Sequence, residues 1–94
     1  MIKHVNIKLT GRVQGVFFRV AVKEKAEELE IKGFVRNKDD GSVYMEAEGE
    51  AEDLEKLVEW CRQGPRLAQV AKVLVEPGVE EQFTDFSIRY TNPT

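Results

Sequence analysis

The feature that most constrains the fold of this chain is the order in which two hydrophobic periodicities follow one another. Apolar and polar residues alternate over residues 5–10, which is typical of a β-strand with one buried face. From Phe18 the apolar residues instead recur every three or four positions, as on one face of an α-helix. The same patterns return later and predict strands over 33–37, 43–48, 71–75 and 86–90 and a second helix over 54–61. The predicted order is β-α-β-β-α-β with a short final strand.

This order predicts the α+β class and, within it, the ferredoxin-like split βαβ sandwich, in which two helices pack on one face of an antiparallel sheet. The first and third strands should share the centre of the sheet, and the second should lie at an edge beside one of them. The Asp40-Gly41 pair predicts a hairpin turn between the second and third strands. With 94 residues, 41% of them hydrophobic, the chain should form a single domain over 1–94, with residues 91–94 as a short tail. Many functions occur on this fold, so the fold alone identifies none of them.

The charge and the rare residue types exclude several classes of function. The formal net charge is −3, and the lysines and arginines are spread along the chain, so we expect neither nucleic acid nor a membrane as a partner. Cys61 and His4 are the only cysteine and histidine, which leaves no credible zinc-binding set, and we expect no metal and no cofactor. Cys61 is expected in the core, and His4 is expected to be a strand residue rather than a catalyst. No segment resembles a signal peptide or a membrane span, so we expect a cytoplasmic protein, and a monomer.

The stretch G-R-V-Q-G-V-F-F-R at residues 11–19 joins the first strand to the first helix and is suited to hold an anion. Glycines let successive backbone N–H groups converge, and the first turn of a helix adds unpaired N–H groups and the positive end of its dipole. Arg19 falls in that first turn, where its guanidinium can donate to a phosphate or a carboxylate. The spacing lacks both G-x-G-x-x-G and the G-K-[ST] ending that binds nucleotide with Mg²⁺. The alternative is a purely structural turn, with Arg19 solvated or paired to acidic residues of the helix.

Two stretches of the chain resemble the two signature motifs of the acylphosphatase family. Residues 11–19 resemble the first motif, and G-F-V-R-N-K-D-D-G-S-V-Y-M-E-A-E-G at residues 33–49 resembles the second. Both motifs appear in full, in order and at a fitting separation, and the resemblance extends over roughly residues 4 to 90. One departure is Tyr44, which stands where the family very often has glutamate. The chain thus resembles the small, single-domain acylphosphatases.

The resemblance implies a specific activity and a specific set of residues. Members of the family hydrolyse the carboxyl–phosphate bond of acyl phosphates, without a metal ion, to a carboxylate and inorganic phosphate. Their phosphate-binding loop corresponds to residues 12–18, their phosphate-binding arginine to Arg19, and the asparagine that positions the attacking water to Asn37. The catalytic pair is therefore expected to be Arg19 and Asn37. The residues expected to bind the substrate phosphate are Gln14, Gly15, Val16, Phe17, Phe18 and Arg19.

These few groups suffice for the implied chemistry. The leaving group is a carboxylate, whose conjugate acid has a pKa near ~4, so it departs without a general acid. Phosphoryl transfer spreads charge over three equatorial oxygens, which the loop amides and Arg19 can bind. The carboxamide of Asn37 can accept from the attacking water and donate with its other end, but it cannot act as a general base near neutral pH. The proton must then pass to solvent or to a phosphate oxygen.

Other interpretations stay open at the level of the sequence. RNA-binding domains also use the ferredoxin-like fold, and K-G-F-V at 32–35 resembles part of an RNA-recognition motif, so the alternative is a non-catalytic anion- or RNA-binding module. A third possibility is a carrier or regulatory domain without activity, which the intact Arg19 and Asn37 disfavour. The side chain of Gln14 can either contact the ligand or only shape the loop.

Overall fold

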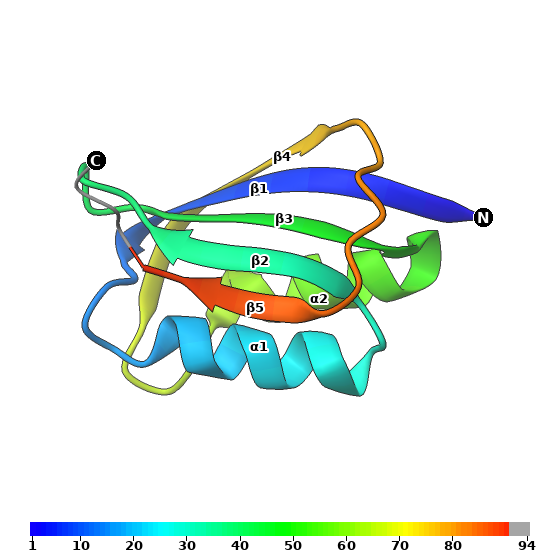
Figure 1. Cartoon of the computed structure of the whole chain (residues 1–94). Helices are drawn as coiled ribbons and strands as arrows, with labels where there is room; N and C mark the ends of the chain where they lie inside the picture. Colours follow the sequence, from blue (N-terminus) through cyan, green and yellow to red (C-terminus); the bar gives the residue numbers. More distant parts are fainter. Residues whose placement is uncertain (91–94) are drawn as a thin grey trace.

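The computed structural model describes residues 1–90 and has the element order that the sequence predicts. Two helices, of 11 and 13 residues, cover one face of a five-stranded sheet (Figure 1), and no helix within residues 1–90 is long and apolar enough to span a membrane. The ferredoxin-like α+β fold is thereby confirmed, whereas the predicted tail, 91–94, lies outside the described residues. The elements are β1 (Ile2–Arg12), α1 (Phe18–Glu28), β2 (Lys32–Asn37), β3 (Val43–Glu50), α2 (Ala51–Gln63), β4 (Gln69–Pro77) and β5 (Phe86–Arg89).

The order of the strands in the sheet is β4-β1-β3-β2-β5. As expected, β1 and β3 occupy the centre, and β1 pairs antiparallel with both β3 and β4. The expectation that the second strand lies at an edge is wrong, because β5 pairs with the far side of β2. This pairing is parallel, so the sheet is mixed rather than wholly antiparallel. The short β5 thus satisfies backbone groups that β2 would otherwise expose at an open edge.

Three strands end at the same end of the sheet. Since β1 and β2 both run antiparallel to β3, they point the same way, and β5 runs parallel to β2. Their carboxyl ends therefore meet on one side of the molecule, where the arrowheads of β1, β2 and β5 lie together in Figure 1. The loop that follows β1, the last residue of β2 and the residue after β5 are consequently neighbours, although they are far apart in the sequence.

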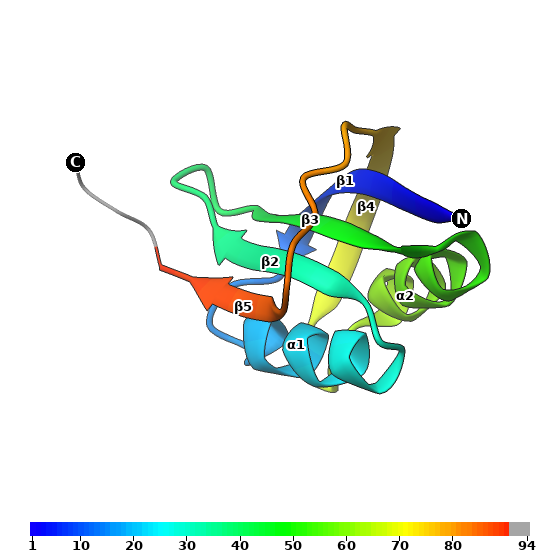
Figure 2. The ribbon, with the colours of Figure 1, turned by 45° about the vertical axis from the view of Figure 1, so that its right-hand side comes forward.

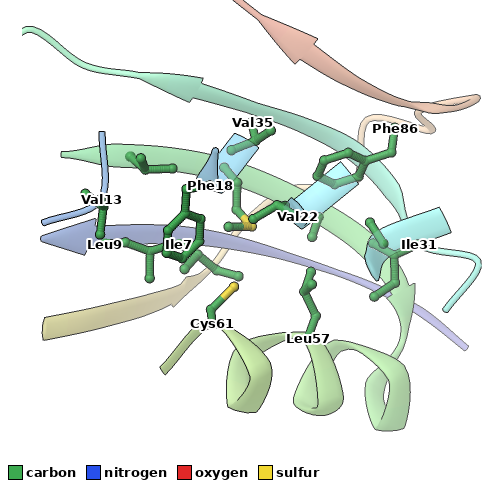
Figure 3. Close-up of a cluster of buried hydrophobic side chains, with 14 of the residues drawn as sticks. Ile7, Leu9, Val13, Phe18, Val22, Ile31, Val35, Leu57, Cys61 and Phe86 are labelled. Carbon is green, nitrogen blue, oxygen red and sulfur yellow. The ribbon is translucent and has the colours of Figure 1, made fainter. Parts of the chain in front are cut away.

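The core fills the space between the helices and the sheet. Phe18 and Val22 of α1 and Leu57 and Cys61 of α2 point into it toward apolar side chains of the strands (Figure 3). Cys61 is fully buried, so its expected place in the core is confirmed. Burial raises the pKa of the Cys61 thiol to about 12, because the thiolate would lose its hydration there.

The other face of the sheet is covered in part by the segment 78–85, which links β4 to β5. This segment crosses the sheet on the side away from the helices (Figure 2). The N–H of Gly78 donates to the carbonyl of His4 at 3.0 Å, and the N–H of Phe83 donates to Glu48 Oε1 at 3.0 Å. His4 belongs to β1, as predicted, but this cover leaves it only 6% exposed on a face that is otherwise partly open.

Candidate active site

The loop between β1 and α1 is held to the core by alternate side chains. Val13, Val16 and Phe18 are 1%, 5% and 2% exposed, whereas Gly15 and Phe17 face outward. Gly15 and Phe17 have left-handed φ values of 74° and 63°, and a Cβ added at Gly15 would meet nothing within 4 Å. The anchored side chains therefore fix the course of the loop, and its backbone at Gly15 stays open to a ligand.

The loop ends at the amino terminus of α1, which offers unpaired donors. Phe17 occupies the N-cap position without a side-chain capping bond, and the first turn contains no acidic residue. The N–H of Ala21 donates to the carbonyl of Phe17 at 3.2 Å, so the preceding amides of Phe18, Arg19 and Val20 have no acceptor within the helix. Such an end favours a negatively charged ligand through both its N–H groups and the helix dipole.

Gln14 leaves the ligand side of the loop and ties it to the β2–β3 hairpin. Its amide nitrogen donates to the carbonyls of Lys38 and Ser42 at 2.7 Å and 2.8 Å. The side chain thus ties the loop to the hairpin. The hairpin turn is where Asp40-Gly41 predicts it: Gly41 has a φ of 91°, and the N–H of Lys38 donates to the carbonyl of Ser42 at 2.9 Å.

A pocket of about 350 Å³ lies where the loop, the start of α1, and the ends of β2 and β5 meet. Arg19 and Asn37, predicted from different motifs, both line it, as do Gly15, Phe17 and Phe18. Of the predicted phosphate-binding residues, Gln14 and Val16 lie outside the lining, because the first turns to the hairpin and the second into the core. The full lining consists of Val13, Gly15, Phe17, Phe18, Arg19, Val20, Asn37, Ile88 and Tyr90.

Val13 belongs to the predicted loop 12–18, whereas Val20, Ile88 and Tyr90 were not predicted to lie at the site. The guanidinium carbon of Arg19 lies 4.9 Å from the centre of the Tyr90 ring, in a cation–π contact that orients it. The alternation of Phe86, Ile88 and Tyr90 was a usable signal, because it places all three on the helix-facing side of the last strand. The alternation does not indicate which strand pairs with the last strand, and that partner is β2.

The pocket is cationic and its rim is apolar. Its lining residues, all within the described part of the chain, include one arginine and no carboxylate, histidine or cysteine. Phe17, Tyr90 and Val20 stand at its mouth and are 76%, 72% and 50% exposed. An anion at Arg19 would therefore have apolar surface beside it.

A larger groove of about 890 Å³ lies between α2 and the strands β1 and β4. None of the residues predicted to act in catalysis or phosphate binding lines it. The smaller pocket is the one in which the amino terminus of α1 and the guanidinium of Arg19 adjoin Gly15 and Asn37.

Comparisons with known proteins show which family the chain belongs to. The sequence model of the acylphosphatase family matches residues 5–88. An acylphosphatase of Methylococcus capsulatus is 46% identical over 87 residues, covering 92% of this chain and 95% of the relative. A solved acylphosphatase from Coxiella burnetii has a TM-score of 0.91 at 41% identity, covering 94% of this chain and 93% of that one. Acylphosphatase from Bacillus subtilis also has a TM-score of 0.91, at 36% identity, and the alignment covers 96% of this chain and 100% of that one.

These similarities show that the chain is an enzyme of the hydrolase class rather than a binding module. It belongs to the acylphosphatase family, whose members act on acyl phosphates and yield inorganic phosphate. The predictions of the family and of enzymatic activity are thereby confirmed.

Proposed function

We propose that this chain hydrolyses acyl phosphates in the pocket of Arg19 and Asn37, by in-line attack of a water molecule and without a metal ion. The observation that carries the proposal is the convergence of Gly15, Arg19 and Asn37 on one pocket of about 350 Å³. The three residues come from a loop, a helix and a strand end, and they supply an open backbone, a cation and a carboxamide.

The phosphoryl group would lie at the amino terminus of α1. The amides of Phe18, Arg19 and Val20 have no helical acceptor, and the Arg19 guanidinium adds a fork of charge-assisted donors. Each preorganised donor of this kind is worth about 2.7–4 kcal/mol when it faces charge that develops in the transition state. The stacking of Arg19 on Tyr90 holds the guanidinium in place before substrate arrives.

Asn37 would hold the attacking water. It is the last residue of β2, and its pairing with Val43 puts it on the same face of the sheet as Val35, toward the helices. A water bound by its carboxamide would face the phosphorus from the side opposite the leaving carboxylate. The amide takes no proton, so the proton passes to a phosphate oxygen or to solvent.

No Lewis acid is needed for this reaction. The leaving carboxylate is a stable anion, and the phosphate charge is met by the guanidinium and backbone donors. The pocket also lacks the carboxylate and imidazole groups that usually bind a catalytic divalent cation. The acyl group would extend past the apolar rim formed by Phe17, Val20 and Tyr90, so aromatic or aliphatic acyl phosphates fit this mouth.

RNA binding on the open face of the sheet is disfavoured by its charge. In RNA-binding domains of this fold, aromatic residues of the central strands stack on bases. Here β1 and β3 carry His4, Glu46 and Glu48 on that face, and the segment 78–85 covers part of it. Carboxylates in these positions would repel a phosphate backbone.

The direct test is hydrolysis of benzoyl phosphate with EDTA present. We expect turnover to be unchanged by the chelator and to be inhibited competitively by inorganic phosphate. The matched controls are Arg19→Ala, which should be inactive, and Arg36→Ala, which removes another aromatic-stacked arginine, 5.8 Å from the Tyr44 ring centre, on the opposite face. Loss of turnover with EDTA and recovery with Mg²⁺ would refute the mechanism.

A further inference from the structure

A second group of ionisable side chains lies on the opposite face of the sheet from the pocket. His4 of β1, Glu46 of β3 and Glu81 of the segment 78–85 place one ligand atom each within 4.8 Å of one another. His4 pairs with Glu48 across the sheet, near the beginning of β1, whereas the catalytic loop follows the end of that strand. The cluster is therefore separate from the Arg19 site in both face and position.

Both ring nitrogens of His4 face oxygen atoms. Nδ1 lies 2.7 Å from Glu48 Oε2, and Nε2 lies 3.1 Å from Glu46 Oε1 and 2.9 Å from Asn6 Oδ1. A neutral imidazole has a single N–H, so with Nδ1–H donating to Glu48, the bare lone pair of Nε2 would point at carboxylate oxygen. Turning the Asn6 amide would not remove the clash with Glu46. A positive charge, either a proton or a metal ion, is needed at Nε2.

The net charge of the cluster favours a metal ion rather than a proton at Nε2 of His4. Even with a charged imidazole, Glu46, Glu48 and Glu81 leave two negative charges in excess around His4. Within residues 1–90, the ion pairs of Glu46 and Glu48 involve only His4, and both carboxylates are largely buried, with side chains 16% and 4% exposed. Excess negative charge around buried groups is costly, and a divalent cation in place of the Nε2 proton would reduce this excess from two charges to one.

We propose that His4 Nε2, Glu46 Oε1 and the Glu81 carboxylate form a binding site for a divalent transition-metal ion such as Zn²⁺. The ion would clamp β1, β3 and the segment 78–85 together. It would have no part in the hydrolysis.

The arrangement has the features of a zinc site with an open fourth position. Ligand atoms held about 2.1 Å from a tetrahedral zinc ion lie about 3.4 Å apart, close to the 3.1 Å between His4 Nε2 and Glu46 Oε1. Glu48 accepts from Nδ1–H of His4 and thereby fixes the ring with Nε2 toward the metal, as outer carboxylates do in zinc proteins. Glu81 is exposed on its loop, so its side chain can close the remaining gap. The oxygen of Asn6 lies beside the open position.

Several interactions already hold the metal-binding groups in place. The hydroxyl of Tyr44 donates to Glu46 Oε2 at 2.7 Å, which leaves Oε1 toward His4. Glu48 also accepts from the backbone N–H groups of Glu81 and Phe83.

The test is a titration of tag-free protein with Zn²⁺, followed through the imidazole resonances. Since His4 is the only histidine, its nitrogen signals are unambiguous. We expect saturable loss or displacement of the Nε2 signal, with a rise in the melting temperature that EDTA reverses. In Glu81→Gln the affinity should fall about tenfold or more, because losing a direct ligand should cost at least as much as losing an outer-shell partner. The matched control, Glu80→Gln, should bind within about twofold of the parent.

Turnover of benzoyl phosphate, with and without saturating Zn²⁺, completes the test. We expect equal rates, because the metal lies on the other face of the sheet from Arg19. Three results would overturn the proposal. The first is no change in the His4 signals at millimolar Zn²⁺, which would mean that Nε2 carries only a proton. The others are equal Zn²⁺ affinity in Glu81→Gln and the parent, or a shift of the imidazole resonances that EDTA does not reverse. Glu81→Gln keeps its backbone bond to Glu48, and circular dichroism would check that the variant is folded.

Discussion

The side chain of Gln14 donates a hydrogen bond of 2.7 Å to the carbonyl of Lys38, the residue that directly follows Asn37. This bond connects the loop that would hold the phosphate to the strand end that would hold the water. A second bond, to the carbonyl of Ser42, fastens the same side chain to the other arm of the hairpin. Gln14 therefore sets the distance between the two halves of the site although it lies outside the pocket.

Replacing Gln14 should separate these halves. Gln14→Leu removes two donors, each worth about 0.5–1.5 kcal/mol, and we expect kcat for benzoyl phosphate to fall about tenfold through misplacement of the water. Gln14→Glu has nearly the same shape but presents only oxygen to two carbonyls, so it should be no better. Steady-state kinetics with circular dichroism would check both. A kcat equal to the parent in either variant would remove Gln14 from the positioning of the site.

The two glycines of the first motif should respond differently to alanine. A Cβ at Gly11 would lie 2.3 Å from the carbonyl oxygen of Gln69, so Gly11→Ala should lower the free energy of unfolding by about 1–3 kcal/mol. Gly15→Ala meets no such contact and should change stability by no more than about 1–2 kcal/mol of left-handed strain, while phosphate affinity falls about tenfold. Urea unfolding and phosphate inhibition distinguish these outcomes. Unaltered phosphate inhibition in Gly15→Ala would argue against a role for this part of the backbone.

Arg19 should hold the phosphate in both ground and transition states. Arg19→Ala should weaken inorganic phosphate binding about tenfold or more and lower kcat about 10²-fold or more. Arg19→Lys should restore little, because an ammonium lacks the bidentate fork and stacks less well on Tyr90. Calorimetric titration with phosphate measures the first effect. If lysine restored both binding and rate, a point charge would be all that the site requires.

Asn37 should act on the water and leave bound phosphate almost unaffected. We expect Asn37→Ala to lower kcat about 10²-fold or more, with phosphate binding within about threefold of the parent. This split between kcat and binding distinguishes it from Arg19. A folded Asn37→Ala protein that turns over substrate at the parental rate would exclude Asn37 from the mechanism.

The Cys61 thiol should not react with a disulfide reagent until α2 separates from the sheet. It is fully buried, and burial raises its pKa to about 12, so almost no thiolate is present or accessible at pH 8. We expect its reaction with a disulfide reagent to be about 10³-fold or more slower in the native protein than in urea. Rapid native labelling would mean that α2 separates readily from the sheet.

The sequence by itself determined the elements and their order, and the resemblance of two motifs predicted Arg19 and Asn37 as the principal groups of the candidate site. The change from period two to helical spacing at Phe18 and the Asp40-Gly41 turn are both local signals. Each is local because burial of one face and positive φ are imposed by near neighbours along the chain. These signals also predicted the two-helix, one-face arrangement, since few folds accommodate that order.

Only the tertiary structure decided which distant segments meet. The parallel pairing of β5 with β2 brings Tyr90 over Arg19, and no local pattern specifies that neighbour. The bonds from Gln14 to the hairpin and the convergence of His4, Glu46 and Glu81 likewise join segments separated by tens of residues. Hydrophobic alternation states which side of a strand is buried but not which strand lies beside it, because strand order is set by long-range pairing and packing of the whole sheet.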